Sequence, residues 1–180
     1  MHHSICCCTQ VAGLRSENPT IKSKSIVAAR ELLVAPEKHI QCIAAGITPA
    51  LRDLLKEGTA GQEDPQEADL HAATAATMQL LVAKEVGCRD ALQHGCLPHI
   101  LQLLKQPSTA VRDAAYGCLC AAAMYEPWRA ALVREGALPA LLLYAQQEEP
   151  QRAAHALALL HHCTQVGLHS CSGLRASRQA

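Results

Sequence analysis

The feature that most constrains the fold is a short phrase that occurs three times along the chain. It reads CIAAGITPALRDLLKEG at residues 42–58, ALQHGCLPHILQLLKQP at residues 91–107 and LVREGALPALLLYAQQE at residues 132–148. Each copy has a glycine, two further residues, a proline, and apolar residues two and five positions after the proline. The glycines are 49 and 41 residues apart. The second spacing falls in the range of roughly 40 to 47 residues that is typical of helical repeat units.

The phrase predicts a sharp turn between two helices. Gly46, Gly95 and Gly136 suit the left-handed backbone that often ends a helix, and the proline three residues later suits the first turn of the next helix. Between the turns the apolar residues recur every three or four positions, which indicates helices and no strands. The predicted helices cover residues 19–34, 36–45, 48–57, 65–83, 85–94, 97–105, 109–124, 127–135, 138–146 and 150–165. Their lengths run long, short, short and then repeat, so we expect an all-α solenoid of three-helix units.

This order of helix lengths resembles that of the repeats in the armadillo-repeat superfamily. The segment VRDAAYGCLCAAA is similar to the third helix of an armadillo repeat, with Val111, Ala115 and Leu119 at its core positions, and GCLPHILQLL is similar to the second helix. The segment RELLVAPEKHIQCIAAGITPALRDLLK and the turn at residues 86–90 followed by ALQHG resemble armadillo-repeat proteins of the axonemal radial spoke head. The resemblance implies a right-handed α-solenoid of about three to four repeats over residues 18–166.

The same resemblance implies a scaffold that binds other proteins and is not an enzyme. The partners would bind the concave face that the third helices form, and the place of action would be the cytoplasm and the axoneme of the cilium or flagellum. Import receptors of the superfamily clamp basic peptides with Trp and Asn, but Gly117 and Ala121 occupy those positions in one unit here, and Ala76 and Leu80 in another. A transport or adhesion adaptor, or a non-catalytic repeat subunit of a ubiquitin ligase complex, is the alternative interpretation.

Composition narrows the class of partner. Lys and Arg together number 16, as do Asp and Glu, so the chain lacks the basic surplus of a nucleic-acid-binding protein and we expect no nucleic-acid partner. No run of 18 or more apolar residues and no secretory leader are present, so we expect no membrane partner. In a reducing compartment the ten cysteines are expected to be small core residues rather than a disulfide framework.

The candidate site residues are all protein-binding ones. Trp128, with Tyr125 and Arg129 beside it, is the best single anchor for an interface, because large aromatic side chains and arginine are enriched in binding hot spots. The other interpretation of Trp128 is that its ring fills the gap between two repeats. Tyr116 and Cys120 are expected on the face of the third helices. We expect no catalytic residues, no cofactor and no metal site.

The two ends and one loop carry separate expectations. Residues 1–17, which contain Cys6, Cys7 and Cys8, are expected to form a flexible leader without the spacing of a zinc site. An acidic insertion loop is expected at residues 58–69, and a disordered tail at residues 167–180. The helix before that tail is apolar nearly all round and does not look like a capping helix. We therefore expect either that the chain is a truncated or alternatively spliced form of a longer array, or that a partner associates through this C-terminal helix.

Overall fold

The computed structural model describes residues 6–57 and 65–173, and over these residues the chain is helical without strands. The all-α prediction is therefore confirmed. The elements are, in order, α1 (Cys7–Leu14), α2 (Pro19–Val34), the short 3-10 helix η1 (Pro36–Lys38), α3 (His39–Ala44), α4 (Ile47–Glu57), α5 (Pro65–Val82), α6 (Glu85–Gln93), α7 (Leu97–Leu103), α8 (Thr109–Ala122), α9 (Glu126–Arg134), α10 (Ala137–Gln147) and α11 (Pro150–Gly173).

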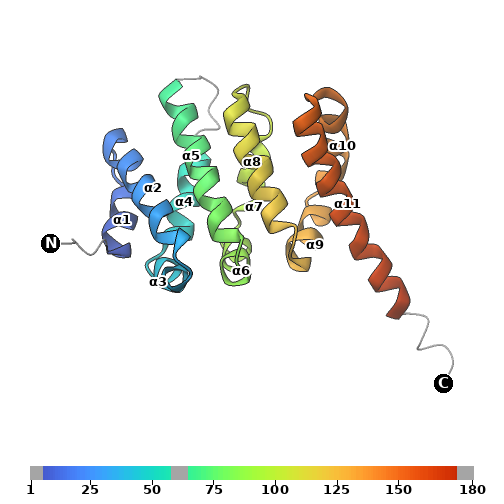
Figure 1. Ribbon diagram of the computed structural model, residues 1–180, viewed down its shortest axis with the longest axis horizontal. Helices are drawn as coiled ribbons and strands as arrows, with labels where there is room; N and C mark the ends of the chain where they lie inside the picture. Colours follow the sequence, from blue (N-terminus) through green and yellow to red (C-terminus); the bar gives the residue numbers. More distant parts are fainter. Residues whose placement is uncertain (1–5, 58–64, 174–180) are drawn as a thin grey trace.

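The helices stack as three-helix units along one axis (Figure 1). The complete units are α3–α5, α6–α8 and α9–α11, and the pair α1 and α2 occupies the place of the second and third helices of a preceding unit. The third helices α2, α5, α8 and α11 lie side by side in one layer, and the second helices α1, α4, α7 and α10 pack behind them. The chain is thus a short solenoid, as the repeated phrase predicts.

Each turn between a first and a second helix is built around the predicted glycine. Gly46, Gly95 and Gly136 have φ angles of +82°, +66° and +66°. Side chains with a Cβ atom adopt this left-handed conformation at a cost of about 1–2 kcal/mol, which explains why glycine recurs at this point of the repeat. Asn18 caps the start of α2, since its side chain accepts hydrogen bonds from the backbone N–H groups of Thr20 and Ile21.

The closest helix pair in the stack is α5 with α8, and small residues make this approach possible. A Cβ atom added to Gly117 would lie 2.8 Å from the side-chain oxygen of Gln79 on α5. Ala75 on α5 and Ala115 on α8 are completely buried. The scarcity of large aromatic residues in the composition is therefore a consequence of closely approaching third helices.

The expectation of a flexible leader needs correction for residues 7–14. These residues form α1, in which Cys7, Val11 and Leu14 are buried. They are spaced four and three residues apart, so they lie on one face of the helix and pack against α2 and α4. The array therefore includes α1 and is not limited to the residues from 18 onward.

The other two boundaries also change. Helix α11 continues to Gly173, so the expected tail at residues 167–180 begins inside a helix. Of the expected acidic insertion, residues 58–64 lie outside the described part of the chain, and residues 65–69 form the start of α5. Among the described helices, none has the length and apolar character that a membrane crossing requires.

Candidate protein-binding face

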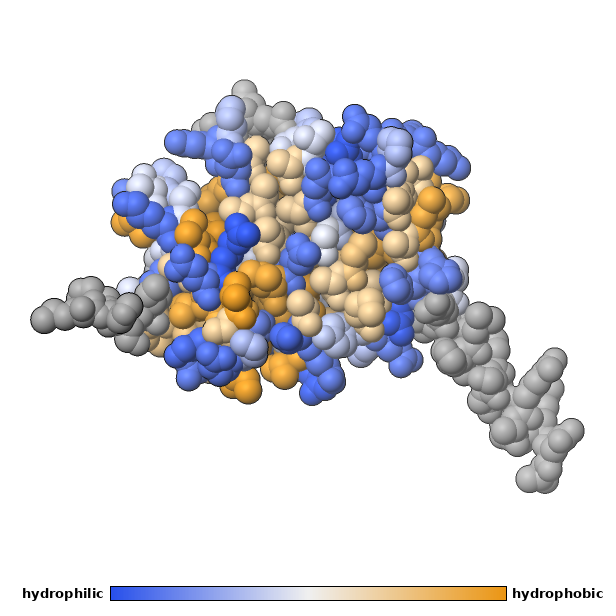
Figure 2. Space-filling model, viewed as in Figure 1, coloured by the Kyte–Doolittle hydropathy of each residue, from blue (hydrophilic) through white to orange (hydrophobic). Residues whose placement is uncertain are grey.

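On the two central third helices, α5 and α8, much of the accessible surface is made of apolar and mostly small residues. Ala73, Ala76 and Leu80 on α5, and Gly117 and Ala121 on α8, are all partly exposed there. Figure 2 looks onto this side of the molecule and shows weakly hydrophobic surface over α5 and α8, with hydrophilic residues around it. We refer to this surface as the third-helix face. Small side chains leave the helix backbones approachable, so the face suits a partner segment that brings its own larger side chains.

Charged residues near the start of α8 and α11 are held by one another. Arg112 and Arg152 both pair with the Glu148 carboxylate, at nitrogen–oxygen distances of 2.8 and 2.7 Å, and Arg152 also reaches Asp113 at 3.2 Å. Hydrogen bonding to Glu148, and then to Asp113, raises the pKa of Arg152 above its ordinary value. The cluster fixes the last third helix to the one before it.

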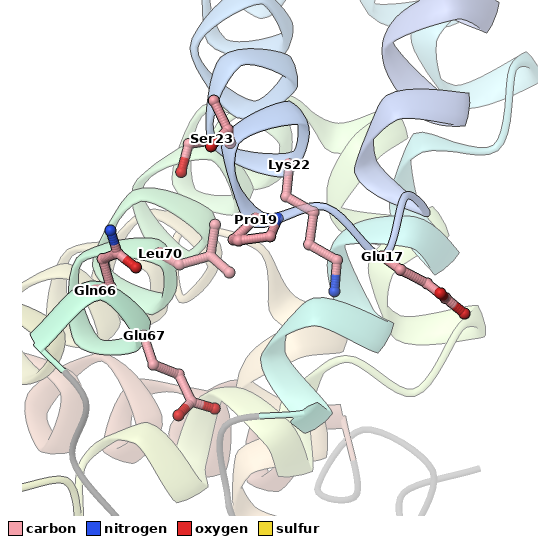
Figure 3. A pocket seen from close by; sticks show the side chains of 8 residues that line it. Glu17, Pro19, Lys22, Ser23, Gln66, Glu67 and Leu70 are labelled. Carbon is pink, nitrogen blue, oxygen red and sulfur yellow. The ribbon is translucent and has the colours of Figure 1, made fainter.

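A pocket of about 490 Å³ opens where α2 and α5 begin. In Figure 3 the Lys22 side chain extends into a space bordered by Leu70 and Pro19 on one side and by Glu17 on the other. Its lining is of mixed charge and partly apolar, and consists of Glu17, Pro19, Thr20, Lys22, Ser23, Gln66, Glu67 and Leu70. Such a lining can receive a side chain of a bound protein segment.

The structure buries two of the predicted binding residues. Tyr116 is 0% exposed and its ring centroid lies 6.1 Å from that of His155 on α11, while Trp128 is also 0% exposed. The prediction that Tyr116 and Trp128 bind a partner is therefore wrong, because neither side chain can contact one. The burial of Trp128 favours the other interpretation, in which its ring fills space in the core of the stack. The half-buried Cys120 lies on α8 with its sulfur 3.9 Å from the carbonyl oxygen of His155.

Tyr125 and Arg129 are partly exposed but lie away from the third-helix face. The Tyr125 hydroxyl donates to the carbonyl oxygen of Ala83 at 2.9 Å. Arg129 donates to the carbonyl oxygens of Ala123 and Met124 at 2.9 and 3.0 Å, which satisfies acceptors at the end of α8. Both residues border a pocket of about 320 Å³ between α6 and α9. The predicted residues therefore do not form one site.

The cysteines near the N-terminus do not converge either. Cys7 points into the core, where its sulfur lies 3.3 Å from that of Cys42, while Cys6 and Cys8 are exposed. Over the described ranges, no group of three or more His, Cys, Asp and Glu side chains could hold a metal ion.

Sequence reasoning missed the pocket at α2 and α5. Lys22 and Glu67 are far apart in the sequence. They line the same pocket because the third helices of adjacent repeats start at the same level of the stack. The repeat period was the one signal that could have placed them together.

Known proteins resemble this chain in sequence and in fold. No protein-family model matches the chain. Radial spoke protein 14 of Chlamydomonas reinhardtii is 44% identical over 163 residues, an alignment that covers 87% of this chain. Over the aligned residues the chain is similar to radial spoke protein 14. It spans only 40% of the length of that relative.

Solved structures agree on the fold. A designed armadillo repeat protein in complex with the peptide (KR)4 superimposes with a TM-score of 0.76 at 18% identity, over 87% of this chain and 63% of the designed one. Computationally designed armadillo repeat proteins for modular peptide recognition give a TM-score of 0.73 at 17% identity, over 86% of this chain and 63% of theirs. These likenesses show that the chain has the fold of an armadillo solenoid.

Proposed function

We propose that this chain is a non-enzymatic protein-binding scaffold of the radial spoke in the axoneme of cilia and flagella. The observation that carries the proposal is the 44% identity to radial spoke protein 14 over nearly the whole chain. The armadillo fold supports it, because stacked repeats create an extended surface that suits the binding of other proteins. The described residues that remain accessible on the third-helix face are the place where we expect the partner to bind.

The chemistry of this face indicates what the partner offers. At the positions where import receptors carry their clamp, the face has Ala76, Leu80, Gly117 and Ala121, so it lacks the aromatic and amide side chains that grip an extended basic peptide. A shallow surface of alanine and leucine favours a partner helix or segment with apolar side chains. The pocket beside Lys22 and Glu67 adds a polar contact at one end of the face.

Proximity labelling in ciliated cells tests the proposal. The full chain, fused to a biotin ligase, is expected to label radial spoke and other axonemal proteins. A double variant on the third-helix face, Val27→Glu with Ala110→Glu, is expected to lose most of this labelling, because both positions are exposed there.

The matched control is Val86→Glu with Ile40→Glu. Val86 and Ile40 are 52% and 68% exposed on the first helices α6 and α3, so this control adds the same charge elsewhere. Labelling of import cargo or of ubiquitin machinery in place of axonemal proteins would refute the proposal in favour of the adaptor alternatives. Equal loss with both double variants would refute the assignment to the third-helix face.

A further inference from the structure

Two cysteine thiols meet at the junction between α1 and α3. The sulfurs of Cys7 and Cys42 lie 3.3 Å apart, although the two residues are 35 positions apart in the sequence. Both side chains are buried, with exposed fractions of 8% and 1%. A disulfide bond joins its sulfurs at about 2.05 Å, so a further approach of about 1.3 Å brings this pair to bonding distance. Binding of a partner on the third-helix face gives the pair no role.

The packing of the repeats does not require sulfur at these two positions. Helices α1 and α4 bury residues at the same spacing of four and then three, namely Cys7, Val11 and Leu14 in α1, and Ile47, Leu51 and Leu54 in α4. Ile47 is therefore the equivalent of Cys7, and the glycine spacing of 49 residues makes Ala91 the equivalent of Cys42. Ile47 and Ala91 are 1% and 0% exposed. Apolar side chains without sulfur thus fill the next junction, and the two thiols add a chemistry that the fold does not need.

Cys7 is the thiol of the pair that an oxidant reaches first. It is the first residue of α1, and the first N–H groups of a helix lack acceptors within the helix, so this turn opens more readily than the helix interior. Cys42 is enclosed, and its burial together with the hydrogen bond to Cys7 raises the pKa of its thiol to about 12. Cys42 therefore keeps its proton until Cys7 has reacted.

We propose that Cys7 and Cys42 form an oxidation site, at which hydrogen peroxide converts the two thiols to a disulfide that ties α1 to α3. The Cys7 thiolate attacks one peroxide oxygen and breaks the O–O bond, which leaves a sulfenic acid on Cys7 and a hydroxide that takes up the released proton as water. The Cys42 sulfur then attacks the Cys7 sulfur and breaks the S–O bond, and the departing hydroxide takes the Cys42 proton as a second water. The thiols lose two electrons in total, and one peroxide is reduced to two waters.

The disulfide would act as a staple across a boundary between units. Helix α1 packs against α2, α3 and α4, and the new bond closes a loop of 35 residues that contains α2. Closing a loop of this length restricts the unfolded chain and so stabilises the folded one. In a reducing compartment such bonds form transiently when the level of oxidant rises. The α1–α3 boundary is thus tighter in the oxidised chain than in the reduced one.

The test uses the full chain with Cys6→Ser and Cys8→Ser, because these exposed thiols hydrogen-bond to each other and compete for the oxidant. The chain is treated with hydrogen peroxide, the remaining free thiols are blocked, and the protein is digested with trypsin. Digestion places the two thiols of the pair in separate peptides, residues 1–15 and 39–52. Mass spectrometry is expected to find these peptides joined with the loss of two hydrogen atoms, and dithiothreitol is expected to separate them.

Thermal melting of the same samples measures the staple. The oxidised chain is expected to melt about 5–10 °C above the reduced chain. The matched control adds Cys42→Ala, which places at this position the residue type that Ala91 supplies at the next junction. Peroxide is expected to give this variant neither the joined peptides nor the rise in melting temperature. Each variant is compared with its own reduced form, so a loss of stability from the substitution itself does not affect the result.

Three results would overturn the proposal. They are peroxide treatment that yields no joined peptides, joined peptides without a rise in melting temperature, and an equal rise in the Cys42→Ala variant. None of these results depends on the third-helix face, so failure here is separable from failure of the proposed function.

Discussion

At the residue scale, the cysteines show how much of a side chain's chemistry depends on where the repeat places it. Burial raises the pKa of the Cys88 thiol to about 11 and that of the Cys96 thiol to about 12, from an ordinary value of 9.0. The sequence correctly indicated that most cysteines are small core residues, since six of the nine described ones are buried. It gave no means to separate Cys7, which is buried, from Cys6 and Cys8 beside it.

These raised pKa values predict a loss of stability in alkaline solution. Below pH 9 the thiols are protonated in both states, so they leave the free energy of unfolding unchanged. Between pH 9 and about 11 the unfolded thiols lose their protons while the folded ones keep them, so the free energy of unfolding falls as the pH rises. Urea unfolding at pH 8 to 10 measures this fall. The variant Cys88→Ala with Cys96→Ala should show a shallower one, and an identical slope would contradict the assignment.

Single substitutions in the N-terminal cysteine cluster test the corrected leader. Cys7→Ser is expected to lower the free energy of unfolding by about 1–2 kcal/mol, because it places a hydroxyl in the apolar core beside Cys42. Cys6→Ser and Cys8→Ser are expected to change it by less than about 0.5 kcal/mol, because both side chains are exposed. Equal and negligible effects of all three, measured by urea unfolding, would restore the flexible leader.

Two substitutions of Tyr116 test whether its ring and its hydroxyl contribute to the stability of the core. Within the described residues its buried hydroxyl has no hydrogen-bond partner. Tyr116→Phe removes that unpaired group and keeps the ring, so stability is expected to stay the same or to rise by up to about 1 kcal/mol. Tyr116→Ala is expected to cost about 3–5 kcal/mol because it leaves a cavity between α8 and α11. A clear loss of stability in Tyr116→Phe, measured by thermal melting, would show that the hydroxyl is partnered.

At the scale of elements, the repeated turn made most helices predictable. Gly46, Gly95 and Gly136 mark a backbone conformation that few other residues adopt, so sequence and structure coincide there. The two errors lie outside the repeated turns. Helix α1 has only eight residues, too few to display a convincing period, and α11 continues through Gly167, where the sequence predicted its end, to Gly173.

One pair of substitutions on the second helices tests the assigned register. Leu103→Asp on α7 is expected to lower the free energy of unfolding by about 3–5 kcal/mol. The side chain of Leu103 is completely buried, so the substitution places an unpaired charge in the core. Leu143→Asp on α10 is expected to be nearly neutral, because Leu143 is half exposed and its equivalents, Asp53 and Gln102, are polar. Thermal melting compares the two, and similar losses would mean that the register is wrong.

At the scale of the whole molecule, the candidate face was predictable only in outline. The resemblance to armadillo proteins indicated that the third helices would line it, but the best-looking anchors by composition, Trp128 and Tyr116, are in the core. The chain has few aromatic residues, and the rings of these two are buried among the small residues of the stacked units. The exposure of Leu157 agrees with the apolar face that the sequence predicts for the C-terminal helix. The exposure of Leu142 on α10 could not be foreseen, since the residues at the same repeat position, Arg52 and Leu101, are half-buried.

The stack also predicts an uneven distribution of stability. Each unit of a solenoid contacts only its neighbours. Helices α5 and α8 have a third helix on both sides, whereas α11 contacts only α8 in this layer. Local opening of α5 or α8 therefore breaks more contacts than local opening of α11. Amide hydrogen exchange is therefore expected to be slowest in α5 and α8 and fastest in α10 and α11. Leu142→Glu with Leu157→Glu should leave this order unchanged, since both side chains are already half exposed. Protection of α11 equal to that of α8 would mean that Leu142 and Leu157 are covered in the isolated chain.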